Sequence, residues 1–274
     1  MRFATWNVNS VAPRLPRLVE WLERAAPDVV CLQETKCAGD AFPYAEVEKL
    51  GYEVLAHGDG RWNGVALISR VGIADESLGF AGQPGFAVPA NDDDALFGAE
   101  PAAVVEARAV GATCGPLRVW SVYVPNGRSL DSPHYPYKLK WLAALRDALQ
   151  PEVAAGGPFA LCGDFNIAPT DDDVWDPAAF VASTHVTDEE RSAYRALLDL
   201  GLRDVMPRPL KYDRPFTYWD YRAGMFHKNM GMRIDLVLAS EPVATKVRDA
   251  YVDRDMRKGT GPSDHAPVVV DVEL

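Results

Sequence analysis

"PFALCGDFNIAPTD", residues 158–171, changes abruptly from apolar to polar groups. The apolar run 159–162 predicts a buried β-strand, and Gly163 permits a sharp turn after it. Asp164 and Asn166 are two residues apart, so the period of a strand places both side chains on one face. Such residues are also common in ordinary surface turns, where they bond their own backbone. This alternative holds unless other strands of the chain end in the same way.

The same change from apolar to polar recurs along the chain. Short runs rich in β-branched or aromatic residues finish in groups that can bind a cation or a phosphate. The runs are 3–8 with Asn7, 29–33 with Glu34, 117–124 with Tyr123 followed by Asn126, 159–162 with Asp164 and Asn166, 233–239 with Asp235, and Asp264-His265 ahead of 268–272. Six such coincidences outweigh the surface-turn alternative. If these strand ends converge at one sheet edge, they form a single pocket.

Helical signals occupy segments between these strands. They are an apolar stripe at Leu15, Leu18, Val19 and Leu22, a capping box of Thr187 and Glu190 ahead of a helix at 194–200, and a helix at 137–149 that Pro151 ends. Further strands at 64–69 and 104–110 supply enough strands for two sheets. We therefore predict a four-layer α/β sandwich, with two mixed β-sheets packed face to face and flanked by helices, in a single domain over residues 1–274.

Composition limits the class of protein. A chain of 274 residues with 48% hydrophobic content can bury a large core, and no Pro/Gly/Ser-rich linker divides it. It has no leader pattern and no apolar run of 18 residues, so we expect a cytoplasmic protein that does not enter a membrane. No oligomerising pattern is present, which makes a monomer the expectation. The four cysteines lack CxxC spacing and indicate neither a zinc site nor a disulfide framework.

Charge is unevenly distributed. The net charge of −11 argues mildly against nucleic-acid binding, because phosphate contacts need Lys and Arg. Residues 203–234 are nevertheless locally basic and contain Phe216, Tyr218, Trp219, Tyr221 and Phe226, a mixture that suits stacking and backbone contact with nucleic acid. A packed aromatic cluster with a solvated rim explains this composition equally well. The acidic runs 92–94 and 171–173 are simpler to explain as a solvated loop and a helix start than as cation sites.

The polar cluster indicates a specific chemistry. Glu34, Asp164, Asp235 and Asp264 would repel one another if all were ionised, so they require a cation or a raised pKa. Oxygen ligands with a single histidine favour Mg²⁺, with Mn²⁺ able to substitute. An Asp-His pair beside the ion suits phosphodiester hydrolysis, in which one aspartate readies a water molecule and another orients His265.

Six motifs then indicate a family. "WNVNS", "LQETK", "YVPNG", "GDFNIAPTD", "RIDLVLAS" and "SDHAP" together resemble the bacterial exonuclease III-type apurinic/apyrimidinic (AP) endonucleases of the endonuclease/exonuclease/phosphatase superfamily. The resemblance covers essentially the whole chain, and "FTYWDYRAGMFHKNMGMRID" is similar to the lesion-reading loop of the DNA repair branch. It implies a DNase I-like fold and Mg²⁺-dependent hydrolysis 5′ to abasic sites in duplex DNA, with 3′-to-5′ exonuclease and 3′-phosphatase activity at blocked 3′ ends. The alternatives are a superfamily phosphoesterase on RNA or a lipid headgroup, and a non-catalytic nucleic-acid-binding relative.

The resemblance also implies roles for single residues. The metal ligands would be Asn7, Glu34 and Asp264, and the catalytic residues would be Tyr123, Asp164, Asn166, Asp235 and His265. Asp164 would align or deprotonate the attacking water, while Asp235 orients His265. DNA would contact Lys36, Asn126, Arg128, Tyr218, Trp219, Arg222, Met232 and Ile234, with the pocket for a base-less sugar formed by Tyr218, Met232 and Ile234. We expect the other four histidines, His57, His134, His185 and His227, at surface or packing positions.

Overall fold

Two six-stranded sheets packed face to face form the centre of the computed structural model, which describes residues 1–87 and 103–274. Each sheet contains one parallel pair, β1 with β2 and β7 with β8, among antiparallel neighbours. The first sheet has the order β11 (Val247–Val252), β12 (Val268–Val272), β1 (Arg2–Asn7), β2 (Val29–Gln33), β4 (Val65–Ser69) and β3 (Glu53–His57). The second has the order β5 (Ala74–Leu78), β6 (Ala109–Cys114), β7 (Leu117–Tyr123), β8 (Phe159–Asp164), β10 (Asp235–Ser240) and β9 (Leu202–Asp204).

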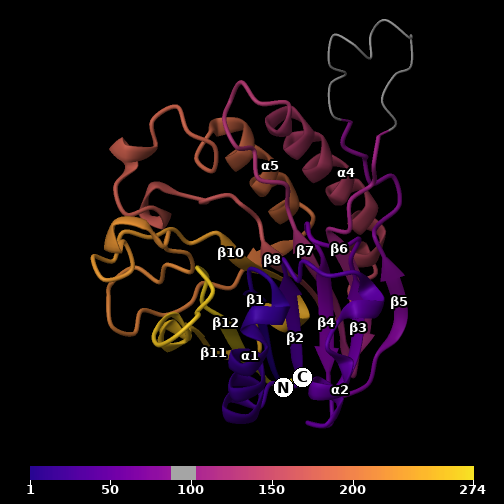
Figure 1. Ribbon diagram of the computed structural model, residues 1–274. Coiled ribbons are helices and arrows are strands. Elements are labelled where there is room, and N and C mark those ends of the chain that lie inside the picture. Colours follow the sequence, from indigo (N-terminus) through magenta and orange to yellow (C-terminus); the bar gives the residue numbers. More distant parts are fainter. Residues whose placement is uncertain (88–102) are drawn as a thin grey trace, which may run out of the picture.

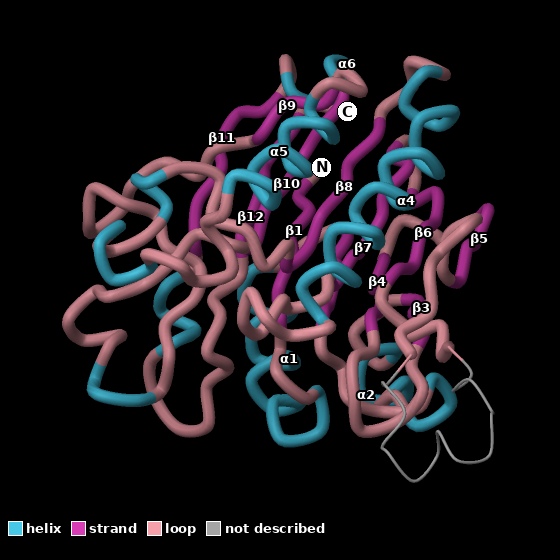
Figure 2. Tube along the Cα trace, turned by 90° about the horizontal axis from the view of Figure 1, so that it is seen from above, coloured by secondary structure: helices cyan, strands magenta, loops and turns pink. Residues whose placement is uncertain are grey.

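Helices cover the outer face of each sheet (Figure 1). Helices α1 (Val11–Ala25) and α2 (Tyr44–Glu48) pack on the first sheet. Helices α4 (His134–Ala154) and α5 (Asp188–Leu198) lie over the strands of the second (Figure 2), and the short α6 (Glu241–Ala244) follows β10. Single 3₁₀ turns connect other segments, at Gly39–Ala41, Asp171–Asp173, Pro177–Phe180, Arg222–Gly224 and Arg254–Arg257. The predicted four-layer sandwich is confirmed.

The central strands are largely apolar and buried because each sheet is covered on both faces, whereas the edge strand β5 is polar and mostly exposed. In β2, Val29 and Cys31 point between the sheets, while Val30 and Leu32 point toward α1. All four side chains are fully buried. Burial raises the pKa of the Cys31 thiol well above its ordinary value, which keeps it protonated and unreactive.

Three predicted boundaries are wrong. Pro151 lies inside α4, which continues to Ala154; proline removes one backbone donor, but Val153 still packs into the core. The strand predicted at 104–110 begins only at Ala109, because Val104 forms an isolated bridge and is 62% exposed. The helix predicted at 194–200 begins earlier, at Asp188, directly after the capping box that Thr187 forms with Glu190.

Two other expectations concern segments outside the sheets. Of the acidic runs, 171–173 forms a 3₁₀ turn, as a helix start was expected there, and 92–94 lies outside the described residues. Within residues 1–87 and 103–274, no helix combines the length and apolar character needed to cross a membrane.

Candidate active site

The six polar strand ends meet at one edge of the sandwich. Strands β1, β2, β7 and β8 finish at this edge, and the antiparallel β10 begins there. The register places Asp164 opposite both Tyr123 of β7 and Asp235 of β10. Asn7 ends β1 and is opposite Gln33, the residue before Glu34. The convergence inferred from the sequence is therefore produced by the strand directions themselves.

Asn7 holds two carboxylates together. Its amide Nδ2 donates hydrogen bonds to Glu34 Oε1 and to Asp164 Oδ2, each at 2.9 Å. Its Oδ1 accepts the backbone N–H of Asn9 at 3.0 Å, and only an oxygen can accept there. The amide nitrogen, not the oxygen, therefore faces the carboxylates, so Asn7 positions them. The metal-ligand role of Asn7 stays a prediction.

His265 is held between two buried aspartates. Its Nδ1 donates to Asp235 Oδ2 at 2.7 Å, and its Nε2 lies 3.8 Å from Asp164 Oδ2. Burial would lower the pKa of His265, but the charges of Asp235 and Asp164 and the hydrogen bond to Asp235 raise it to about 10. The two aspartates therefore favour the protonated form of His265.

Asp164 is the carboxylate with a raised pKa. Burial is the main cause, and although His265 opposes it, the nearby Asp235 and Glu34 charges add to the effect, giving a pKa of about 7. Burial also acts to raise the pKa of Glu34, but the cation of Lys36 and the hydrogen bond from Asn7 outweigh it and keep that pKa low. Two neighbouring carboxyl groups thus titrate far apart, which is typical of an acid–base site.

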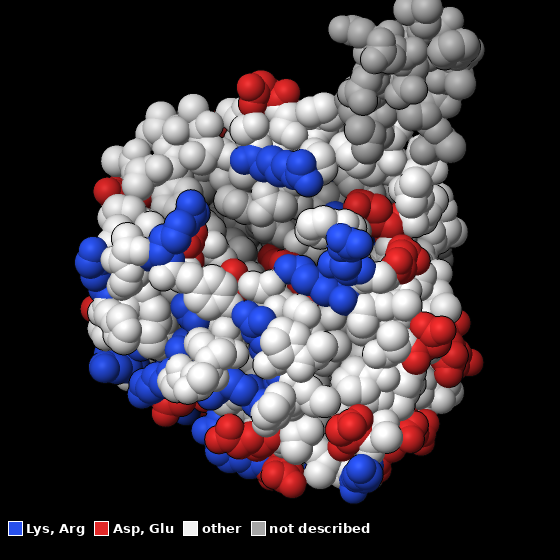
Figure 3. Space-filling model, in the orientation of Figure 1, with Lys and Arg blue, Asp and Glu red and all other residues white. Residues whose placement is uncertain are grey.

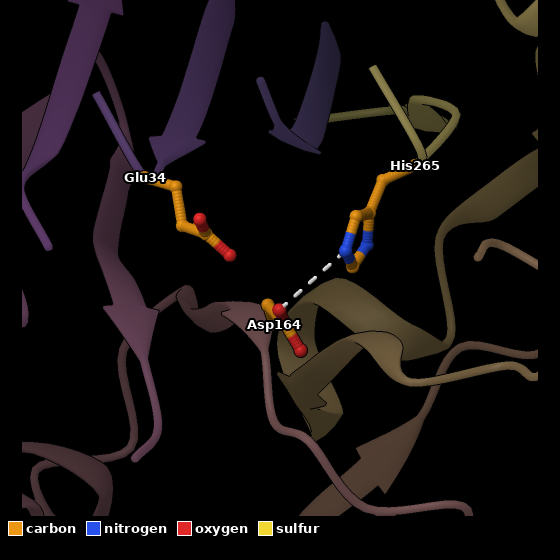
Figure 4. A group of neighbouring side chains, drawn as sticks. All are labelled: Glu34, Asp164 and His265. Atoms are coloured by element: carbon orange, nitrogen blue, oxygen red, sulfur yellow. Dashed lines mark ion pairs between the residues drawn. The ribbon is translucent and has the colours of Figure 1, made fainter. Parts of the chain in front are cut away.

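Three of these side chains could hold a metal ion. Glu34, Asp164 and His265 each offer one ligand atom, and these atoms lie within 4.8 Å of one another (Figure 4). Two carboxylate oxygens favour a hard cation such as Mg²⁺ or Mn²⁺. Asp264, a predicted ligand, lines the same cavity but is outside this group, and its Oδ1 accepts a hydrogen bond from Asn9 Nδ2 at 3.0 Å.

Lys36 lies beside this cluster. Its Nζ is 2.7 Å from Glu34 Oε2 and donates to Asn9 Oδ1 at 2.6 Å. The ammonium group of Lys36 is therefore paired with the Glu34 carboxylate, and its contact with a substrate phosphate stays a prediction.

Asn166 has a left-handed backbone, with φ of 51°. Its backbone N–H donates to Asp164 Oδ1 at 2.9 Å, and its Oδ1 accepts from Asn126 Nδ2 at 2.9 Å. Its Nδ2 donates to the carbonyl of Val124 at 3.0 Å, which leaves one amide hydrogen for a substrate. This strained conformation is consistent with a functional position.

Sequence reasoning missed the buried groups that hold Asn166 in place. The Asn166 carbonyl accepts a hydrogen bond from Lys138 Nζ and another from His185 Nδ1, both at 2.6 Å. Lys138 pairs with Glu190 at 2.5 Å, and both side chains are completely buried. Burial and the charge of Lys138 lower the pKa of His185 to about 4, so this ring is neutral. The capping box signal of Thr187 and Glu190 was visible in the sequence, but its burial was not.

The predicted DNA-binding residues divide into two groups. Tyr218, Met232 and Ile234 line a cavity of about 160 Å³ together with His185 and the catalytic cluster. Trp219 does not, because it is 1% exposed and packs edge-on against Phe226. A side chain buried to this extent cannot stack on a base. The prediction that Trp219 contacts DNA is therefore wrong, and its ring packs inside the loop instead.

Arg128 and Arg222 are exposed, and Asn126 is half-buried. The side chain of Arg222 is 86% exposed and pairs with Asp220 at 2.5 Å. Arg128 donates its backbone N–H to Asn126 Oδ1 at 2.8 Å. In Figure 3, acidic atoms lie in a hollow at the middle of the face, with Lys and Arg side chains around its edge.

Comparison with known proteins defines the relationship. Residues 4–265 match the Endonuclease/Exonuclease/phosphatase family. The chain belongs to this family. It is 33% identical to exodeoxyribonuclease III of Haemophilus influenzae, with 98% of each chain covered. It is also 26% identical to an exodeoxyribonuclease of Bacillus subtilis over the whole of both chains.

Solved structures agree with this assignment. A 3′-5′ exonuclease (NExo) from Neisseria meningitidis superposes with a TM-score of 0.88 at 36% identity, covering all of both chains. An AP endonuclease from Archaeoglobus fulgidus gives 0.87 at 34% identity, again over both whole chains. The family resemblance inferred from the six motifs is confirmed. Members of this family depend on a metal ion, and the acidic cluster above suits one.

Proposed function

We propose that the protein is a Mg²⁺-dependent nuclease of DNA repair that hydrolyses phosphodiester bonds in duplex DNA. The observation that carries this proposal is the cluster of Glu34, Asp164 and His265, with Asp235 behind the histidine. The carboxylate oxygens of the cluster suit Mg²⁺ and, as a substitute, Mn²⁺, while His265 serves as a hydrogen-bond donor beside them. The relatives named exodeoxyribonuclease III and AP endonuclease support the reaction class.

The residues of the cluster divide the work between them. A bound divalent cation would supply positive charge to the phosphate and lower the pKa of an attacking water. Asp164, which offers a carboxylate oxygen close to Glu34 and His265, would align that water or accept its proton. Protonated His265 gives one N–H to Asp235 and can offer the other to a phosphate oxygen.

Tyr123 and Asn166 contribute hydrogen bonds. Burial and the charge of Glu34 raise the pKa of Tyr123 well above its ordinary value, so its hydroxyl remains a donor at neutral pH. Asn166 retains one free amide hydrogen. Both donors would stabilise negative charge that develops on the phosphate in the transition state.

The proposed substrates are abasic sites in duplex DNA and blocked 3′ ends. The cavity of about 160 Å³ that Tyr218, Met232 and Ile234 line suits a sugar-sized group, since pockets for larger ligands hold about 300 Å³ or more. A base-less nucleotide is also cheap to extrude, because little stacking or pairing is broken. Reaction at 3′ ends is favoured by the neighbour described as a 3′ phosphatase bound to a product DNA hairpin.

One gel separates these functions. The protein is incubated with Mg²⁺ or EDTA and four labelled substrates: a duplex with one abasic-site analogue, a duplex with a 3′-phosphate, an intact duplex, and RNA. We expect Mg²⁺-dependent incision 5′ to the abasic site and removal of the 3′-phosphate, and loss of both in Asp164→Asn. Asp172→Asn, whose carboxylate is 89% exposed on a nearby loop, is the matched control. Full activity in EDTA, or cleavage of RNA alone, would refute the proposal.

A further inference from the structure

A second cavity adjoins the catalytic one. It has a volume of about 350 Å³, and we call it the side pocket. Three residues, His185, Tyr218 and Met232, line both cavities, so the two are adjacent. The ring of Tyr218 lies 4.9 Å from the ring of His265, centroid to centroid. The side pocket therefore begins one ring away from the proposed catalytic histidine.

One part of the wall of the side pocket is apolar and partly open to solvent, while Arg128 and Asp220 are among its polar lining residues. Trp175, Phe180, Met225 and Met230 line it, and each is only half-buried. Large apolar side chains gathered at an open pocket indicate a ligand surface. Aromatic rings and the polarisable methionine side chain pack against flat ring systems without requiring one hydrogen-bonding pattern.

We propose that the side pocket holds the nucleobase of an unpaired 3′-terminal nucleotide while the phosphodiester of that nucleotide lies at the catalytic cluster. This inference rests on the proposed nuclease function. In the hydrolysis, water adds to phosphorus and the P–O3′ bond breaks, which releases the terminal nucleotide as a nucleoside 5′-monophosphate and leaves a 3′-hydroxyl. The released sugar is the group that occupies the catalytic cavity.

The two cavities together fit a nucleotide that neither fits alone. The catalytic cavity, at about 160 Å³, suits the sugar, and the adjoining 350 Å³ gives the attached base a place beside it. An abasic sugar would leave the side pocket empty. A 3′-phosphate would also leave the side pocket empty, because its removal does not require any base to leave the base stack of the duplex. The side pocket therefore acts only in removal of whole nucleotides, and favours ends that are mismatched or frayed.

Substitutions in the side pocket test this selectivity. KM and kcat are measured for Trp175→Ala and Met225→Ala on a duplex with a mismatched 3′-terminal nucleotide, a duplex with a 3′-phosphate, and a duplex with an internal abasic analogue. We expect KM for the mismatched end to rise about 10-fold, as for loss of one stacking partner. The other two substrates should change less than about 2-fold, and Trp175→Phe should restore the mismatched-end KM.

A binding measurement makes the test independent of hydrolysis. The parent is titrated in EDTA against a duplex ending in an unpaired 3′ 2-aminopurine, and we expect a fluorescence change that Met225→Ala reduces. Leu210→Ala, an apolar residue 56% exposed outside the side pocket, is the matched control and should resemble the parent.

The outcomes separate the two proposals. Equal losses on all three substrates, or an unchanged KM for the mismatched end, overturn the side-pocket assignment while the nuclease function stands. A parent that hydrolyses none of the DNA substrates refutes the nuclease function. In that case the 2-aminopurine titration still decides whether the side pocket binds a base.

Discussion

Asp235→Asn removes one charge from the centre of the proposed active site with little change in shape. Asp235 accepts a hydrogen bond from His265 at 2.7 Å, and the two residues are 1% and 3% exposed. The variant keeps the volume and one oxygen of the side chain. It therefore tests whether the charge of Asp235 orients and protonates His265.

The expected magnitude follows from the contact. Two unit charges about 4 Å apart interact by about 4 kcal/mol at an effective dielectric constant of about 20, which corresponds to about 3 pH units in a pKa. Because Asp235 stabilises the protonated form, its loss should lower the pKa of His265 from about 10 toward about 7. About half of the histidine would then be neutral at pH 7, which costs only about 2-fold, and the lost orientation of the ring should bring the fall in turnover to about 10²-fold or more.

Two assays check these values. NMR titration of the His265 ring in metal-free protein measures the pKa, and single-turnover cleavage of an abasic duplex measures the rate. The double variant Asp235→Asn/His265→Ala should be little slower than His265→Ala, because the pair acts as a unit. An unchanged His265 pKa, or rate losses that multiply fully in the double variant, would refute the orienting role.

Three further predictions address the metal, the buried pair and the DNA-reading loop. Glu34→Gln should raise the Mg²⁺ concentration needed for half-maximal rate at least about 10-fold, because loss of even the groups that orient a metal ligand lowers metal affinity about 10- to 100-fold. The affinity for DNA should change little. Exposed Glu46→Gln is the control. Lys138→Met leaves Glu190 buried without its cation and should lower the free energy of unfolding by about 3–5 kcal/mol in urea, whereas exposed Lys140→Met should not. In the parent, burial acts to raise the pKa of Glu190, but Lys138 and hydrogen bonds outweigh it and lower the pKa to about 2. The pair's contribution to the free energy of unfolding is therefore complete above the unfolded pKa near 4.5 and declines as the pH falls toward 2. The Lys138→Met variant should instead become more stable on acidification. Arg222→Ala should weaken binding to abasic duplex and make the binding constant depend less steeply on salt concentration. Tyr218→Ala should reduce the ratio of cleavage at abasic sites to cleavage at intact sites. If both variants match the parent, this loop does not recognise the lesion.

The strand ends could be predicted because strand direction and chemistry agree in the sequence. Asp164 and Glu34 each follow a short apolar run, and parallel strands deliver their final residues to the same edge. The adjacent Asp264-His265 pair could be assigned to the same edge because it directly precedes a predicted strand. Six local signals, each weak alone, thus specified one site and one architecture.

Orientation and burial could not be predicted in the same way. Whether Asn7 turns its oxygen or its nitrogen toward the carboxylates depends on the backbone N–H of Asn9, which a motif does not reveal. The basic and aromatic neighbours of Trp219 predicted that it stacks on DNA bases. It is instead buried in a packed aromatic cluster, which was the alternative explanation of this composition. His185 contacts the Asn166 carbonyl from the segment ahead of α5, and the buried Lys138–Glu190 pair lies beside it, a tertiary contact that no local motif indicates.

The net charge of −11 is compatible with DNA binding once its location is considered. Asp164 and Asp235 are buried and the other two acidic groups are partly buried, and a metal ion would offset their charge, so they repel DNA less than the same number of exposed carboxylates. Exposed Arg128 lines the side pocket, and Lys and Arg side chains surround the hollow in Figure 3, where phosphates would approach. Since salt screens charges beyond about 8–10 Å, the approaching duplex responds to this rim more than to the acidic remainder of the surface. Local charge, not the sum, therefore decides the partner.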